Sequence, residues 1–416
     1  MNVQTEPNVR LKGEVLVPLS KSAAQRAIAA ACLAKGRSVL HNISYSDDVN
    51  IAIGLAESLG ARVERLNSSL VINGNFSLKN NVLFVGESGL STRMFVPLAA
   101  LQGREFIVEG KGTIVNRPMT VFERILPAFG LEVETTGGFL PLRISGKLKP
   151  ANVLMDASDT SQILTGLLMA LPLSGGRSVL RVENLKSRPY IDLTLDIMEH
   201  FGVSIENYSY RRFVVDRQKY VPADLFIEGD WSGAAFWFVA AAISGDILIK
   251  GLDKNSKQAD KAIIDVMKSS GVDVRCLHNG YRVRKSRIKP FVFDATDSPD
   301  LFPALAVLAA NANGISKIKG VHRLAHKESN RARAIVENFV SLGIKCVIDD
   351  DFLIIEGGQK IGSGIFGTYS DHRMAMAGAV LSLTSGELEI DDKKCVSKSY
   401  PGFFEQFEKL KSNTGF

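Results

Sequence analysis

The sequence predicts an α/β fold of two domains, each built from three repeats of helices and strands. A helix start rich in serine and small residues recurs six times. Each of these starts opens a predicted helix that ends near a glycine, and these glycines recur at regular spacing. After each glycine the sequence predicts a strand, an amphipathic helix and further strands. A single hydrophobic core stops growing near roughly 250–300 residues, so six repeats are expected to divide three and three. The spaced glycines are Gly36, Gly103, Gly176, Gly245, Gly314 and Gly386.

The first repeat shows the pattern most clearly. Ser20 can cap a helix through its hydroxyl, and the alanine-rich residues 23–34 favour a narrow, buried helix. Gly36 stands where a left-handed helix end is expected. Lys21 and Arg26 lie about one turn apart at the helix start, where free amides and the helix dipole also favour negative charge. This helix start therefore predicts an anion site.

The rest of that repeat reads as a strand at 38–43, a helix at 46–59 and a hairpin of 63–66 with 70–72. Two consecutive strands in each repeat favour mixed rather than purely parallel sheets. The later helix starts lie at residues 87–93, 159–162, 229–233, 296–300 and 368–373.

The domain boundary is expected between the third and fourth repeats. The predicted domains are residues 19–227, and residues 1–18 together with 228–416. The sixth repeat is short, and the N-terminal strand near residues 9–17 is expected to complete it.

Charge and composition indicate small anionic partners. The net charge is +6, but the cations are dispersed and stand beside serines at helix starts, so a nucleic-acid partner is not expected. The N-terminus lacks the pattern of a signal peptide, and the longest apolar run, residues 234–243, is too short to span a bilayer. We therefore expect a cytoplasmic protein with no membrane partner.

Cysteine and histidine spacing argues against a metal. Cys32, Cys276, Cys346 and Cys395 are scattered singly, which is typical of reduced thiols. His322 and His326 are four apart, a spacing that can chelate a metal on a helix, but the preceding Gly320 and a missing glutamate argue against it. We predict no metal and no cofactor.

An ordered set of motifs carries a family resemblance from about residue 11 to the C-terminus. The chain resembles the 5-enolpyruvylshikimate-3-phosphate (EPSP) synthases, a family of enolpyruvyl transferases. The motifs are Leu19-Ser20-Lys21-Ser22, Arg26, Asp47-Asp48, Asn116-Arg117-Pro118, Thr160-Ser161-Gln162, Arg188-Pro189-Tyr190-Ile191-Asp192, Lys327-Glu328-Ser329-Asn330-Arg331, Asp371-His372-Arg373-Met374-Ala375-Met376 and Lys398-Ser399-Tyr400-Pro401.

The resemblance implies a fold and a reaction. The fold is two domains of three βαβαββ-type repeats with pseudo-threefold symmetry, an inverted α/β barrel. The 5-hydroxyl of shikimate 3-phosphate adds to the enol carbon of phosphoenolpyruvate, and the resulting ketal phosphate eliminates inorganic phosphate. The resemblance places this step in the shikimate pathway to chorismate and aromatic amino acids, in a family targeted by glyphosate. No cofactor is implied, and a monomer is expected.

The resemblance also assigns roles to single residues. The catalytic residues would be Asp300 at the 5-hydroxyl and Glu328 with Lys21 at the methylene carbon, with His372 as a supporting residue. The phosphoenolpyruvate site would comprise Lys21, Gly89, Arg117, Gln162, Arg331, Arg373 and Lys398. The shikimate 3-phosphate site would comprise Lys21, Ser22, Arg26, Thr160, Ser161, Gln162, Ser187, Tyr190, Asp300 and Lys327. Residues 19–227 would bind mainly shikimate 3-phosphate, and the other domain would complete the phosphoenolpyruvate site.

Some positions depart from the family, and other interpretations stay open. The family's usual Asn-Ala-Gly-Thr loop is Glu87-Ser88-Gly89-Leu90 here, and Met94 replaces a proline. Taken singly, Asp300 could merely cap a helix, and Glu328 could pair with Arg331 on an exposed helix face. The alternative functions are a UDP-sugar enolpyruvyl transferase and a non-catalytic phosphometabolite-binding protein.

Overall fold

The computed structural model describes residues 10–325 and 327–412. Contacts divide the chain into two compact units. We call Leu19–Glu228 the central unit, and the N-terminal segment up to Pro18 together with the chain from Gly229 onward the split unit. Each unit has its own hydrophobic core.

The central unit holds three repeats, and each repeat forms one four-stranded sheet. The first comprises α1 (Lys21–Leu33), β2 (Gly36–His41), α2 (Asp47–Ser58), β3 (Arg62–Arg65), β4 (Ser69–Gly74) and β13 (Asp224–Phe226). The second comprises β5 (Val82–Phe84), α3 (Gly89–Ala100), β6 (Phe106–Glu109), η1 (Gly112–Asn116), α4 (Thr120–Ile125), η2 (Leu126–Phe129), β7 (Leu131–Thr136) and β8 (Phe139–Gly146). The third comprises β9 (Asn152–Asp156), α5 (Gln162–Ala170), η3 (Leu171–Leu173), β10 (Ser178–Glu183), α6 (Arg188–His200), β11 (Glu206–Tyr208) and β12 (Arg212–Val215).

The split unit repeats the pattern, with a shortened last repeat. Its first repeat comprises β1 (Leu11–Leu16), α7 (Trp231–Ser244), β14 (Gly245–Lys250), η4 (Ala259–Ala262), α8 (Ile263–Ser269), β15 (Asp273–Leu277) and β16 (Gly280–Arg284). Its second comprises β17 (Val292–Asp294), η5 (Pro299–Leu301), α9 (Phe302–Ala310), β18 (Ile315–Lys319), η6 (Val321–Leu324), α10 (Arg331–Ser341), β19 (Lys345–Asp349) and β20 (Phe352–Glu356). Its third comprises β21 (Gly364–Phe366), α11 (His372–Leu381), β22 (Leu388–Ile390), η7 (Lys394–Lys398) and α12 (Phe403–Ser412).

Every four-stranded sheet in the described part of the chain follows one topology. The first strand pairs in parallel with the second, the second pairs antiparallel with the fourth, and the third closes a hairpin with the fourth, as in the order β5-β6-β8-β7. In the sheet of β2, the later strand β13 takes the place of the first strand. A buried helix joins the parallel pair directly in the sheets that begin with β5, β9 and β17, and in all of these sheets the hairpin follows an outer helix. The predicted α/β architecture of repeated strands and helices with mixed sheets is therefore confirmed.

Two strands pair outside the repeat that follows them in sequence. β1 precedes α1 yet pairs in parallel with β14, with Leu11 opposite Gly245. β13 precedes α7 yet pairs with β2. The prediction that the N-terminal strand completes the sixth repeat is therefore wrong. The sixth repeat already has a strand of its own, β21, before α11, whereas β14 has an open edge because β13 pairs with β2.

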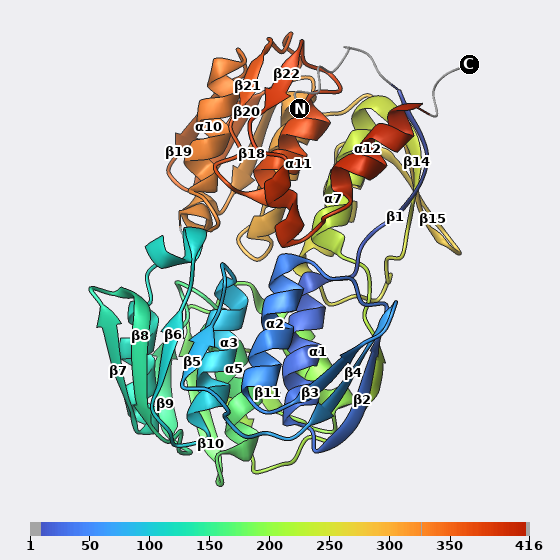
Figure 1. Cartoon of the computed structure of the whole chain (residues 1–416). Coiled ribbons are helices and arrows are strands. Elements are labelled where there is room, and N and C mark those ends of the chain that lie inside the picture. Colours follow the sequence, from blue (N-terminus) through green and yellow to red (C-terminus); the bar gives the residue numbers. More distant parts are fainter. Residues whose placement is uncertain (1–9, 326, 413–416) are drawn as a thin grey trace. The chain divides into compact units, whose positions relative to one another are not determined.

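Helices that are apolar on all sides form the centre of each unit. In the central unit, α1, α3 and α5 pack together, and every residue of α3 is buried (Figure 1). In the split unit, α7, α9 and α11 pack together, and every residue of all three is buried. A helix without a polar face is stable only when neighbours cover it completely. Each central helix therefore has only its N-terminus available for polar chemistry.

The end of α1 differs from the prediction. The helix ends at Leu33, and its C-cap is Ala34, whose backbone is extended (φ −75°, ψ 125°), and not Gly36. Gly36 instead opens β2 with φ +128°, and a Cβ there would lie 2.8 Å from Cγ of Pro222. The glycine is thus required by the strand start and its contact, not by a helix cap.

No helix in the described part of the chain is long and apolar enough to cross a membrane.

Gly166 and Gly54 provide a matched test of the helix packing. A Cβ at Gly166 on α5 would lie 2.4 Å from the Arg93 carbonyl oxygen on α3, whereas a Cβ at Gly54 on α2 would have no atom within 4 Å. We expect Gly166→Ala to lower the free energy of unfolding by about 1–3 kcal/mol or more, and Gly54→Ala to raise it by about 0.5–1 kcal/mol. Thermal melts followed by circular dichroism measure both. Equal shifts in the two variants would contradict the close packing of α3 on α5.

Candidate functional site

Three helix N-termini of the central unit are held beside one another by buried polar contacts. Gln25 on α1 donates from Nε2 to the hydroxyls of Ser88 (2.8 Å) and Ser91 (2.9 Å) at the start of α3. Arg93 on α3 contacts Oε1 of Gln162, the first residue of α5, at 3.3 Å. The N-termini of three helices therefore lie in one region, which favours a bound anion.

These helix starts are capped in different ways. The Ser20 hydroxyl accepts from the amide of Ala23, and the Ser88 hydroxyl accepts from that of Ser91. Ser161 makes no such bond, and the Thr160 hydroxyl accepts instead from the amide of Gln162, at 3.1 Å.

Arg93, which the sequence analysis did not assign to the site, lies between two predicted site residues. Its Nη1 donates to the carbonyl oxygen of Gly89 and to Gln162, and its Nη2 donates to the carbonyl oxygen of Pro118. A Cβ on Gly89 would lie 2.9 Å from Nη1 of Arg117 and 3.1 Å from Nη1 of Arg93. Burial lowers the pKa of Arg93 to about 10, and the nearby Arg117 adds to the shift. Two guanidiniums thus meet at the glycine that opens α3.

Arg117 lies in the extended link after η1 and not at a helix start, because α4 begins only at Thr120. The Arg117 side chain is buried and donates from Nη2 to Oγ1 of Thr113, at 3.3 Å. Thr113 in turn donates to Oε2 of Glu87 from its amide (2.9 Å) and its hydroxyl (3.0 Å). The departure from the family at position 87 therefore places a carboxylate that anchors the loop carrying Arg117.

Lys21 and Arg26 on α1 have different environments. Lys21 forms an ion pair with Asp48, at 2.8 Å, and both side chains are partly exposed. Arg26 is buried, and its guanidinium donates to the Thr194 hydroxyl and to the carbonyl oxygens of Ser22 and Tyr190. Burial lowers the pKa of Arg26 to about 10. These contacts fix Arg26 and its neighbours on α1 and α6 as one rigid group.

Ser187 precedes α6 in a strained backbone conformation. Its φ is +55° and its ψ is 44°, a left-handed region that non-glycine residues rarely adopt. Ser187 is buried, and Tyr190 lies three residues further on, under the guanidinium of Arg26 at 5.8 Å from the ring centroid. Such strain often marks a ligand-binding position.

In the split unit, Arg331 is the centre of a buried ion cluster. The Arg331 side chain is 0% exposed and contacts three acids: Asp371 at 2.7 Å, Asp300 at 2.6 Å and Glu328 at 2.5 Å. Burial opposes the charge, but Asp371, Glu328 and Asp300 together raise the pKa of Arg331 well above its ordinary value. Glu328 does pair with Arg331, yet on a buried guanidinium and not on an exposed helix face.

Asp300 is shared by three cations. It contacts Arg331 and Lys327 (3.2 Å) through Oδ1 and Arg373 (3.3 Å) through Oδ2. Burial raises the pKa of Asp300, but Arg373, Lys327 and Arg331 outweigh burial and hold it well below its usual range. Asp300 lies inside η5, whose N-cap is Ser298, so Asp300 is not the cap of this turn.

The helix start of α11 completes this cluster. Asp371 caps α11 by accepting from the amide of Arg373, at 2.9 Å. His372 is fully buried, with Nδ1 3.7 Å from Asp371. Lys398 is buried and donates to the carbonyl oxygen of Ser370, at 2.9 Å. The predicted residues of the split unit thus gather at the starts of η5, α10 and α11.

The predicted joint role of Lys21 and Glu328 remains a prediction. Lys21 belongs to the central unit and Glu328 to the split unit, so their joint role at one carbon is a proposal taken up below. His326 lies outside the described residues, and its partner in the predicted spacing, His322, contacts Asp351 through Nδ1 at 2.5 Å.

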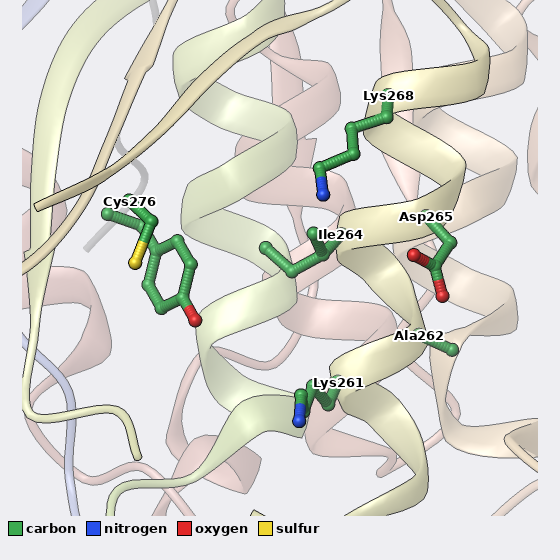
Figure 2. A pocket seen from close by; sticks show the side chains of 7 residues that line it. Lys261, Ala262, Ile264, Asp265, Lys268 and Cys276 are labelled. Atoms are coloured by element: carbon green, nitrogen blue, oxygen red, sulfur yellow. The ribbon is translucent and has the colours of Figure 1, made fainter. Parts of the chain in front are cut away.

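A pocket of about 440 Å³ lies in the split unit (Figure 2). Lys261 and Lys268 come from η4 and α8, and Cys276 and Tyr281 come from the hairpin of β15 and β16. None of the predicted site residues lines it. We assign the site to the charged helix starts, because they carry the buried cations and the perturbed carboxylate.

Comparisons with known proteins identify the family of the chain. The family model described as EPSP synthase (3-phosphoshikimate 1-carboxyvinyltransferase) matches residues 5–407. Proteins named 3-phosphoshikimate 1-carboxyvinyltransferase from Clostridium kluyveri and Clostridium novyi are 38% and 35% identical to the chain. The matches cover 96% and 98% of this chain, and 95% and 97% of the relatives.

Solved structures share the fold. An EPSP synthase from Acinetobacter baumannii matches with a TM-score of 0.81 and 24% identity, covering 99% of this chain and 98% of that one. The enolpyruvyl transferase NikO from Streptomyces tendae matches with a TM-score of 0.76 and 16% identity, covering 98% and 97%. Since the family model spans nearly the whole sequence and the named relatives exceed 30% identity over almost their full length, the chain belongs to the EPSP synthase family.

Proposed function

We propose that the chain transfers the enolpyruvyl (1-carboxyvinyl) group of phosphoenolpyruvate to the 5-hydroxyl of shikimate 3-phosphate and releases inorganic phosphate. The observation that carries the proposal is the ion cluster of the split unit, in which one carboxylate, Asp300, shares its two oxygens among three cations. This is the arrangement expected where a base must act beside bound anions. Membership of the EPSP synthase family supports it.

The reaction requires a base, a proton donor and several cations. The 5-hydroxyl loses its proton as its oxygen bonds to the enol carbon, and the methylene carbon gains a proton. The ketal phosphate then loses a proton from the new methyl group and expels phosphate. We assign Asp300 to the hydroxyl and Glu328 with Lys21 to the methylene carbon.

Binding roles follow the placement of the cations. We assign phosphoenolpyruvate to Lys21, Gly89, Arg117, Gln162, Arg331, Arg373 and Lys398, and we add Arg93 because it meets Arg117 at Gly89. We assign shikimate 3-phosphate to Lys21, Ser22, Arg26, Thr160, Ser161, Gln162, Ser187, Tyr190, Asp300 and Lys327. Arg26 would act by holding the backbone of Ser22 and Tyr190, to which it donates.

The charge around Asp300 suggests how its basicity changes during binding. With three cations on it, the Asp300 carboxylate is a weak base, because its pKa is held well below the usual range. A trianionic substrate that binds Arg331 and Arg373 would weaken their hold on Asp300 and raise its pKa. Phosphoenolpyruvate binding would thus activate the base that the 5-hydroxyl of shikimate 3-phosphate needs.

We further propose that the chain acts in the cytoplasm as a monomer, without nucleic acid or a cofactor. The four cysteines are free, and Cys32, Cys346 and Cys395 are buried, as suits a reducing compartment.

Phosphate release tests the proposed function directly. The purified chain is incubated with phosphoenolpyruvate and either shikimate 3-phosphate or a UDP-sugar, and free phosphate is measured. We expect release only with shikimate 3-phosphate. Release with the UDP-sugar alone would favour the other transferase, and tight binding of both small molecules without release would favour a phosphometabolite-binding protein.

Asp300→Asn should lower kcat by about 10²–10⁴, because it removes the positioned base and keeps the shape. The dissociation constant for shikimate 3-phosphate, measured by calorimetry, should change little. A near-normal kcat in this variant would remove Asp300 from the role of base.

Arg117→Lys should raise the KM for phosphoenolpyruvate at least tenfold, which is roughly the lower end of the effect of one charged hydrogen bond. Lysine cannot reproduce the two-pronged guanidinium that reaches Thr113 and faces Gly89. Arg124→Lys on α4 is the matched control, since Arg124 is half exposed and pairs with Asp159. If both variants kept the same KM, Arg117 would not belong to the anion site.

A further inference from the structure

Asp260 is a buried carboxylate that the roles above do not use. It lies in η4 and is 0% exposed. Its Oδ2 accepts a short hydrogen bond from the hydroxyl of Ser232, on the first turn of α7. Within the part of the chain that the structure describes, its Oδ1 has no hydrogen-bond partner. A buried carboxylate oxygen without a partner is costly, so a purely structural acid would be expected to use both oxygens.

The charged groups around Asp260 come from three different helix starts. Asp230 caps α7, Asp300 lies in η5, and Arg373 lies in the first turn of α11. All three interact electrostatically with Asp260. Burial and the negative charge of Asp300 raise the pKa of Asp260 to about 7, while Arg373 lowers it.

Arg373 is the less completely bound of the two guanidiniums in the cluster. Arg331 contacts three carboxylates at 2.5–2.7 Å. Arg373 contacts Asp300 at 3.3 Å, and its buried Nε has no partner among residues 10–325 and 327–412. Burial lowers the pKa of Arg373, but Asp300 raises it above its ordinary value, with Asp260 and Asp230 contributing. A buried donor and a buried acceptor, both without partners, therefore belong to neighbouring groups of opposite charge.

We propose that Asp260 is a positioning residue for Arg373, whose guanidinium it holds through Oδ1 when Asp300 turns to the 5-hydroxyl of shikimate 3-phosphate. The inference rests on the proposed function, because it follows from the two duties of Asp300. As an ion-pair partner Asp300 holds Arg373, and as a base it must accept a proton from substrate. Asp260 retains Arg373 in the second state, so that this cation stays directed at the phosphoenolpyruvate anion.

Two variants of Asp260 and one of Ser232 test the proposal in the full-length chain. Asp260→Asn keeps the shape but offers at best a neutral acceptor, and Asp260→Ala removes the acceptor. We expect kcat/KM for phosphoenolpyruvate to fall about tenfold in the first and further in the second, with KM for shikimate 3-phosphate within about twofold of wild type. Ser232→Ala, which releases the other carboxylate oxygen, should give a smaller fall. Asp265→Asn on the exposed face of α8 is the control and should change nothing.

The pH profile distinguishes positioning from a structural role. The pH dependence of kcat/KM reports groups of the free enzyme. Because ionised Asp260 is the form that holds Arg373, kcat/KM for phosphoenolpyruvate in wild type should rise through a step near pH 7. This step should be absent from Asp260→Asn and present in Asp265→Asn.

Thermal melts show whether the variant folds. The folded-state pKa of Asp260, about 7, lies above the ordinary aspartate value of 3.8, so the folded state keeps a proton that the unfolded state releases. Wild type therefore loses stability as the pH rises from about 4 to 7. Asp260→Asn lacks this loss of stability. The difference between its melting temperature and that of wild type should therefore increase as the pH rises from about 4 to 7. A variant that is more stable at pH 8 yet uses phosphoenolpyruvate poorly cannot owe its defect to misfolding.

The outcomes separate this proposal from the proposed function. If wild type releases no phosphate from the two substrates, the proposed function fails. Calorimetric titration of phosphoenolpyruvate into wild type and Asp260→Asn then still tests whether Asp260 positions the guanidinium of Arg373. If wild type is active and Asp260→Asn keeps both its kcat/KM for phosphoenolpyruvate and the step near pH 7, the proposal is overturned. Equal losses for both substrates would also overturn it, since they would indicate a general distortion.

Discussion

The ion cluster around Arg331 is the constraint on which the chemistry of the split unit depends. Its guanidinium is fully buried and contacts Asp371, Asp300 and Glu328 at 2.5–2.7 Å. Removing one member of such a cluster would leave a buried charge uncompensated, which costs several kcal/mol as a rule. The helix cap Asp371, the assigned base and the assigned proton donor are therefore held by one side chain. Their mutual orientation is set before any substrate arrives.

In the central unit, the guanidiniums of Arg93 and Arg117 donate to neutral acceptors. Arg93 and Arg117 meet at Gly89, and their neighbours are carbonyl oxygens, the Gln162 amide and the Thr113 hydroxyl. Neutral acceptors orient a guanidinium without neutralising it. The buried guanidinium of Arg331 in the split unit is thus matched by carboxylates, whereas Arg93 and Arg117 of the central unit are oriented by neutral groups.

Repetition made much of the fold predictable from sequence. Serine-rich segments before apolar helices mark positions where only the helix N-terminus can contact polar groups. This repeated pattern predicts the helix starts at Ser20, Gly89, Gln162 and Asp371 from the sequence. Arg93 was missed because its position inside an apolar helix, between Thr92 and Met94, resembles ordinary packing. Asp260 lies in the short turn η4, outside the serine-rich helix starts by which the sequence marks the site. The pairing of β1 could not be read locally either, because it depends on a strand that the chain reaches more than two hundred residues later.

The exchanged strands have a consequence for synthesis on the ribosome. β1 precedes the central unit in the chain, yet its neighbour β14 ends only at Lys250, so β1 cannot pair until the entire central unit has been made. β13, in contrast, follows its neighbour β2 and can close the central unit as soon as Phe226 is available. The order of the strands along the chain thus lets the central unit fold first. The split unit then folds with β1, which stays unpaired until β14 has been made. Unpaired strand edges invite association with other chains, so this interval is the stage of biogenesis at which a chaperone would matter most.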